Sequence, residues 1–146
     1  MKGGLIMAFT GALGYRRTDG AAPVPVSFTA GATALEATMP VKLASGLVVI
    51  CATNDTAILG WMAADAAAGA EALVYLAEPS LLVKLVFDGT YAAASVGISA
   101  EITVGASSCT INDDEVTNEL MNMVKLVDAT AKTAWYAHKV GCCQMF

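Results

Sequence analysis

The clearest hydrophobic pattern in the chain lies in Leu81–Phe87, where one set of alternate positions is wholly apolar and the other contains Lys84. Period-two patterning in Val, Leu and Phe is typical of a strand. Two shorter apolar runs, Ile58–Met62 and Leu73–Ala77, also read as strands. The small-residue segment between them contains Gly69, which can adopt the positive φ of a tight turn. This part of the chain therefore predicts three strands with two tight connections.

Further strands are predicted on either side of this stretch. Ala44-Ser45-Gly46 reads as a hairpin connection between Met39–Leu43 and Leu47–Ala52. The run Leu47–Cys51 is apolar on both faces, which predicts a central, covered strand. A helical turn is expected in Tyr91–Val96, and the remaining strands are expected at Glu101–Val104, Cys109–Ile111, Met121–Val127 and Ala134–Val140. Strands at roughly ten-residue spacing predict a mainly β fold, a small β-barrel or sandwich.

Residues 1–35 differ from the rest because they show no sustained period. They contain glycines at positions 3, 4, 11, 14, 20 and 31, and Pro23 and Pro25 favour an extended backbone. We therefore predict an extended N-terminal arm over residues 1–35 and a β-barrel or sandwich domain over residues 36–146. The alternative for the arm is an edge strand that folds back on its own domain.

The composition indicates a surface that partners cover. The chain is 56% hydrophobic and only 14% charged, against about 25% charged residues in ordinary globular domains. No uncharged run is apolar and long enough for a spanning helix of about 20 residues, so we predict no membrane partner. The net charge of −5 disfavours a nucleic-acid partner, because phosphate binding requires a basic stripe.

The only histidine, His138, lies in an alternating segment that places it on one face with Tyr136. A catalytic triad would also need a nucleophile and a carboxylate within reach, and the sequence has no GxSxG or comparable elbow. We interpret His138 as a partly exposed strand residue without a catalytic role. We expect His138→Ala to change stability by no more than about 1 kcal/mol.

Metal binding is weakly supported by the sequence. Asp113-Asp114-Glu115 lacks the spacing of a calcium loop and reads as a solvated acidic turn. The four cysteines form no CxxC pair, and a zinc site built from Cys51, Cys109, His138 and Cys142 lacks ligand spacing. We predict four reduced thiols, no metal and no cofactor.

One stretch resembles a known family. The order PVKLASG (Pro40–Gly46), ILGWM (Ile58–Met62), DAAAG (Asp65–Gly69) and ALVYL (Ala72–Leu76) is similar to the small capsid cement, or head decoration, proteins of tailed bacteriophages. The resemblance covers roughly residues 39–90, and its motifs are turn and strand chemistry.

The resemblance implies a structural virion protein. Such a protein is made in the host cytoplasm, binds the outside of the phage head and stabilises contacts between major capsid protein subunits. The low charged fraction adds the expectation of a homo-oligomer, for which we predict a trimer. The alternatives are a tail or baseplate accessory module and a small hydrolase-like enzyme that uses His138.

The expected interface combines the N-terminal arm with two anchor residues outside it, Trp61 and Phe146. Aromatic residues dominate binding hot spots, so both Trp61 and Trp135 are candidate anchors, although tryptophans are more often core residues. The apolar tail that ends at Phe146 is expected to dock on this domain or on a neighbour. We expect a truncation that begins at Ala32 to fold but to bind shells poorly. The predicted interface residues are Leu5, Ile6, Phe9, Leu13, Tyr15, Arg16, Trp61 and Phe146.

Overall fold

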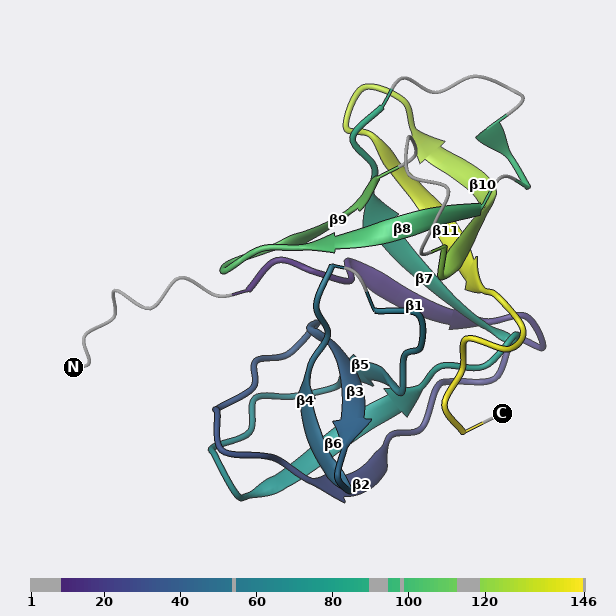
Figure 1. Ribbon diagram of the computed structural model, residues 1–146. Helices are drawn as coiled ribbons and strands as arrows, with labels where there is room; N and C mark the ends of the chain where they lie inside the picture. Colours follow the sequence, from purple (N-terminus) through teal and green to yellow (C-terminus); the bar gives the residue numbers. More distant parts are fainter. Residues whose placement is uncertain (1–8, 54, 90–94, 98, 113–118, 146) are drawn as a thin grey trace.

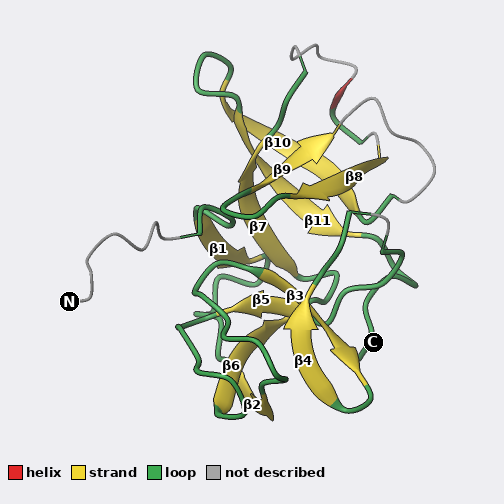
Figure 2. Ribbon diagram, turned by 60° about the vertical axis from the view of Figure 1, so that its left-hand side comes forward, coloured by secondary structure: helices red, strands yellow, loops and turns green. Residues whose placement is uncertain are grey.

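The computed structural model describes residues 9–53, 55–89, 95–97, 99–112 and 119–145, and these residues are mainly β. They form two antiparallel sheets, which appear as two lobes in Figures 1 and 2. The six-stranded sheet has the order β1 (Gly14–Arg17), β7 (Leu81–Val86), β11 (Thr133–His138), β10 (Met121–Asp128), β8 (Ser99–Val104) and β9 (Cys109–Asn112). The five-stranded sheet has the order β2 (Val26–Thr29), β6 (Glu71–Leu76), β5 (Gly60–Met62), β3 (Pro40–Ala44) and β4 (Leu47–Ile50). The predicted mainly β fold is confirmed, as a sandwich-like arrangement and not a closed barrel.

The alternation that predicted β7 also decides which face of the six-stranded sheet is covered. In β7, Leu81, Val83 and Leu85 are buried in the core; on the opposite face Lys84 and Val86 are half-buried, and Leu82 is buried outside the core cluster. Strand β11 alternates in the same way along its whole length. Because side chains in a strand point to opposite faces in turn, these two central strands give the sheet one core face and one outer face.

The predicted turns are in place, but one strand position is wrong. Ser45 and Gly46 have φ values of 53° and 81° and join β3 to β4, as expected for a two-residue hairpin. Gly69 has the predicted positive φ, at 73°. Strand β4, however, lies at the end of its sheet and is not central. The side chain of Val48 on β4 is fully buried in the core. The outer edge of β4 is occupied by the segment at Gly31, whose N–H donates a hydrogen bond to Val48 O at 2.9 Å.

Two segments of the predicted arm are strands of the sheets. Strand β1 pairs with β7, and β2 pairs with β6, so residues 14–17 and 26–29 are edge strands of their own domain. Phe9 and Ala30 are buried in the common core. For residues 9–35 the structure therefore corrects the arm to the alternative, a segment folded back on its own domain. These edge strands are half exposed and short, so they lack the periodicity by which a longer strand is recognised.

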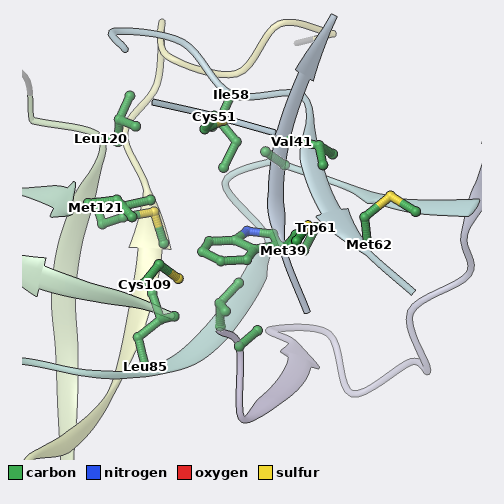
Figure 3. Close-up of a cluster of buried hydrophobic side chains, with 14 of the residues drawn as sticks. Met39, Val41, Cys51, Ile58, Trp61, Met62, Leu85, Cys109, Leu120 and Met121 are labelled. Atoms are coloured by element: carbon green, nitrogen blue, oxygen red, sulfur yellow. The ribbon is translucent and has the colours of Figure 1, made fainter. Parts of the chain in front are cut away.

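The core lies between the two sheets, and its largest fully buried side chain is Trp61 on β5. Figure 3 shows the indole extending toward Leu85, Cys109 and Met121 of the six-stranded sheet, with Met39, Val41 and Met62 on the other side. An aromatic ring of this size fills the space that shorter side chains from both sheets leave open.

The C-terminal tail docks on its own domain. Ile58 N–H donates to Cys142 O at 2.8 Å, and Gln144 N–H donates to Ile58 O at 2.9 Å. The Gln144 side chain accepts a hydrogen bond from Leu43 N–H at 2.7 Å. Residue 146, most of the predicted helical turn at 91–96 and the acidic run 113–115 lie outside the described residues.

We predict that a truncation beginning at Ala32 does not fold stably, which replaces the expectation from the sequence. The deletion removes both edge strands together with the buried side chains of Phe9, Ala12 and Ala30. The matched control begins at Phe9 and keeps every strand. Thermal melts followed by circular dichroism compare the two chains. A cooperative transition for the shorter chain near that of the control would contradict the prediction.

A second prediction concerns Gly60 on β5, which pairs with Leu76 of β6. A Cβ atom added to Gly60 would come within 2.0 Å of Tyr75 O and 2.8 Å of Val74 Cγ1. Gly60→Ala should therefore lower the free energy of unfolding by about 1–3 kcal/mol or more, because backbone atoms must move apart. The control is Gly105→Ala, whose Cβ would lie 3.4 Å from its nearest neighbour, Ser108 O. Urea unfolding measures both variants, and an equal loss in the two would rule out the steric explanation.

Candidate functional site

The sequence-based candidate for catalysis, His138, is buried and not partly exposed. Its exposed fraction is 3%, because the even-numbered side chains of β11 face the core. Its Nε2 accepts a hydrogen bond from Trp61 Nε1–H at 2.9 Å, so Nδ1 carries the proton and faces Glu78 O at 3.3 Å. Both ring nitrogens are thus engaged within the protein, and this histidine has no free nitrogen for a substrate.

The environment of His138 keeps the ring neutral. Burial lowers its pKa from 6.5 to about 4, and the nearby backbone oxygens of Glu78 and Leu81 offset only part of this effect. A neutral imidazole fits the hydrogen bond from Trp61, which requires an acceptor at Nε2. The expectation that His138→Ala is nearly neutral therefore no longer holds, since the substitution would leave a cavity and an unpaired Trp61 N–H.

Three of the four thiols, Cys51, Cys109 and Cys143, are poorly suited to nucleophilic chemistry because burial raises the pKa of each. Burial raises the pKa of Cys109 to about 12 and that of Cys143 to about 11, so both are protonated at neutral pH. All four cysteines are free in the structure. Within the described ranges, no three His, Cys, Asp or Glu side chains are grouped as metal ligands would be.

The predicted interface residues fall into four groups. Trp61 and Phe9 lie in the core and are not available to a partner in this conformation. Tyr15 is half-buried, and its ring lies 4.7 Å from that of Tyr75, so it joins β1 to the other sheet. Exposed side chains remain at two positions, Leu13 and Arg16. Leu5, Ile6 and Phe146 lie outside the described residues.

Arg16 belongs to an exposed cluster that the sequence analysis did not identify. On the outer face of the six-stranded sheet, the Arg16 Cζ atom lies 4.8 Å from the centroid of the Trp135 ring, and Lys84 Nζ lies 5.9 Å from it. Trp135 pairs with Lys84 across β7 and with Lys125 across β10. Trp135 therefore has Arg16 and Lys84 within cation–π distance and Lys125 as its strand partner on β10, and we call Arg16, Lys84, Lys125 and Trp135 the cationic face.

The cationic face borders a surface hollow with a volume of about 270 Å³. Arg16, Trp135 and Lys125 line it together with the aliphatic side chains of Leu126 and Val127. The bulge in β10 near Val124 interrupts the strand's regular alternation and brings consecutive residues toward this rim. The hollow therefore offers both positive charge and apolar surface.

Among the described residues, the charges of the cationic face differ from three other cations in their lack of a paired carboxylate. Arg17 pairs with Glu78 and Asp19, Lys42 with Asp55, and Lys139 with Glu119. In contrast, no described carboxylate lies within 4.0 Å of Arg16, Lys84 or Lys125.

A sequence signal for this face was present but unspecific. The alternation of the segment around Trp135 places that residue opposite His138, and hence opposite the core. The meeting of Trp135 with Arg16 depends on the pairing of β1 with β7, which joins residues nearly seventy positions apart and has no local signature.

Comparisons with known proteins leave the family open. No protein-family model matches the chain, and no curated protein matches it. In the part of the chain that the structure describes, no helix is long and apolar enough to cross a bilayer.

The Trp61–His138 pair predicts a loss of stability in acid. The unfolded chain binds a proton at His138 below pH 6.5, whereas the folded chain does so only near pH 4, so stability falls as the pH drops through this window. The contribution is on the order of 3 kcal/mol. Urea unfolding at pH 7 and pH 4.5 measures it.

His138→Gln is the control, because glutamine does not titrate but can still accept from Trp61. The variant should be less stable at pH 7 and should lose less stability on acidification. The difference between the two chains removes the contribution of carboxylates such as Glu78. Identical losses in both chains would show that His138 does not carry the effect.

Proposed function

We propose that this chain is a structural protein of a phage head, a decoration protein that binds the outer surface of the shell and reinforces contacts between major capsid protein subunits. The proposal combines the family resemblance of residues 39–90 with a surface suited to assembly. It assigns no reaction to the chain.

The observation that carries the proposal is the apolar character of the exposed surface. Large aliphatic side chains are exposed on several elements, and only 14% of all residues are charged. Val140 and Val24 are 82% and 78% exposed. The full set among the described residues is Leu13, Val24, Val26, Leu47, Val96, Val124, Val127, Val140 and Met145. Exposed aliphatic side chains combined with so few charges favour a surface that partners cover.

The position of His138 supports a non-catalytic role over the hydrolase alternative. A general base must reach the proton that it removes, and this imidazole is buried with both nitrogens engaged. A tail or baseplate module remains the second candidate, because its surface requirements are similar. The binding partner distinguishes the two.

Co-sedimentation tests the proposal directly. The purified chain is mixed with empty shells of the same phage, and the control replaces the shells by unassembled major capsid protein. We expect saturable binding to shells and a rise in the temperature at which the shells disrupt, since a partner that binds only the assembled state stabilises it by mass action. Absence of binding to shells, or binding to isolated tails alone, would overturn the decoration role.

Two sets of variants locate the contact. Val24→Lys and Val140→Lys place a charge in the two most exposed aliphatic positions, and Thr130→Lys in the exposed β10–β11 turn is the control. At least one of the valine variants should bind shells about tenfold more weakly, because a buried unpaired charge is strongly unfavourable. The truncation that begins at Phe9 measures the contribution of residues 1–8, which include Leu5 and Ile6. Sedimentation velocity of the free chain tests the proposed trimer.

A further inference from the structure

We propose that the cationic face is a docking site for an extended acidic segment of a partner protein. In this arrangement carboxylates of the segment pair with Arg16 and Lys125, and an aliphatic side chain between them enters the hollow beside Trp135. The inference concerns the chemistry of the partner segment and does not depend on whether that partner is a capsid protein.

The first argument is charge complementarity. The chain carries a net charge of −5, yet three of its eight Lys and Arg residues converge on one face of one sheet. Ion pairs engage Arg17, Lys42 and Lys139 elsewhere, whereas no described carboxylate pairs with these three. Like charges on neighbouring strands repel each other, so carboxylates from outside would relieve a repulsion as well as form new pairs.

The second argument is that the face is built in advance. Trp135 extends across β7 until its Cη2 atom lies 3.6 Å from the position that a Cβ atom would take at Gly14, which is van der Waals distance, so the ring is packed against β1. The indole in turn holds the Arg16 guanidinium and the Lys84 ammonium by cation–π contacts. A side chain that is already held loses less conformational entropy on binding. The guanidinium can still donate in pairs to a carboxylate.

The third argument is the form of the hollow. A volume of about 270 Å³ lies just below the usual range for sites that enclose a whole small molecule. It is suited to one or two side chains of a peptide. Trp135, Leu126 and Val127 supply its apolar lining, and Val127 is 46% exposed. The occupant therefore needs an apolar residue between acidic ones.

The geometry favours an acidic peptide over nucleic acid. Three cations in one cluster do not form the stripe that follows a phosphate backbone, and the rest of the chain is acidic. Carboxylates flanking an aliphatic side chain match both the charge and the hollow.

Titration with a designed peptide tests the site. The probe is a soluble peptide with the repeat Glu-Ser-Val-Ser, which in an extended chain places Glu and Val on the same face, and its neutral counterpart has Gln in place of Glu. Binding is followed by the NMR signal of the Trp135 indole N–H, assigned with Trp135→Phe. We expect the Glu peptide to shift this signal saturably and the Trp61 signal to stay in place. Higher salt should weaken the binding, because the pairs are exposed.

Matched variants make the result specific to the site. Arg16→Gln and Lys125→Gln should each weaken the affinity about three- to fivefold. Lys132→Gln removes the same charge from the adjacent turn, outside the hollow, and should leave the affinity unchanged. All three positions are exposed, so the fold should be retained, which circular dichroism verifies.

Several outcomes would overturn the proposal. Equal binding of the Gln peptide would show that charge does not select the ligand, and an equal loss in Lys132→Gln would reduce the effect to net charge. A Trp135 signal unmoved by the Glu peptide at millimolar concentration would exclude the site. A shift with a DNA duplex in place of the peptide would assign the face to phosphates. A shift with protein concentration alone would assign it to a second copy.

Discussion

The hydrogen bond from Trp61 to His138 is the interaction on which the arrangement of the two sheets depends. The donor belongs to β5 of the five-stranded sheet and the acceptor to β11 of the six-stranded sheet, and both residues are almost fully buried. Apolar contacts between two sheets tolerate sliding, because they are not directional. A buried polar pair does not, since a small displacement leaves two unpaired groups in a medium without water. The pair therefore fixes how the sheets lie relative to each other.

The crossover between the sheets is held at the same place. Glu78-Pro79-Ser80 connects β6 to β7, and the proline marks a point where the ladder ends. Glu78 O faces His138 Nδ1, while its carboxylate accepts from Ser80 Oγ and pairs with Arg17 at the end of β1. These contacts lower the pKa of the Glu78 carboxyl, the Ser80 hydrogen bond contributing most. One connection thus links the core pair to the edge strand, and the orientation of Arg17 toward Glu78 directs its neighbour Arg16 to the outer face.

Local chemistry decided which parts of the fold were predictable from the sequence. Strands β3 to β11 followed from apolar runs, alternation and turn residues within each segment, and the turn at Ser45-Gly46 followed from its residue types. The pairing between distant segments could not be predicted, because the sequence of one strand does not indicate which other strand it pairs with. The edge strands β1 and β2 were therefore read as an arm, and β4 as a central strand. Burial of His138 was missed for the same reason, since its partner Trp61 lies seventy-seven positions away.

The same limit explains why the candidate site shifted from one tryptophan to the other. Residue type alone does not distinguish Trp61 from Trp135. What distinguishes them is the face of the strand on which each side chain lies. Trp61 fills the space between the sheets, whereas Trp135 faces outward on the strand that also carries His138 inward. Strand β11 thus contributes to stability through one face and to the cationic surface through the other. Because pairing with β7 fixes its register, the core that buries His138 also sets the position of Trp135 between Arg16 and Lys125.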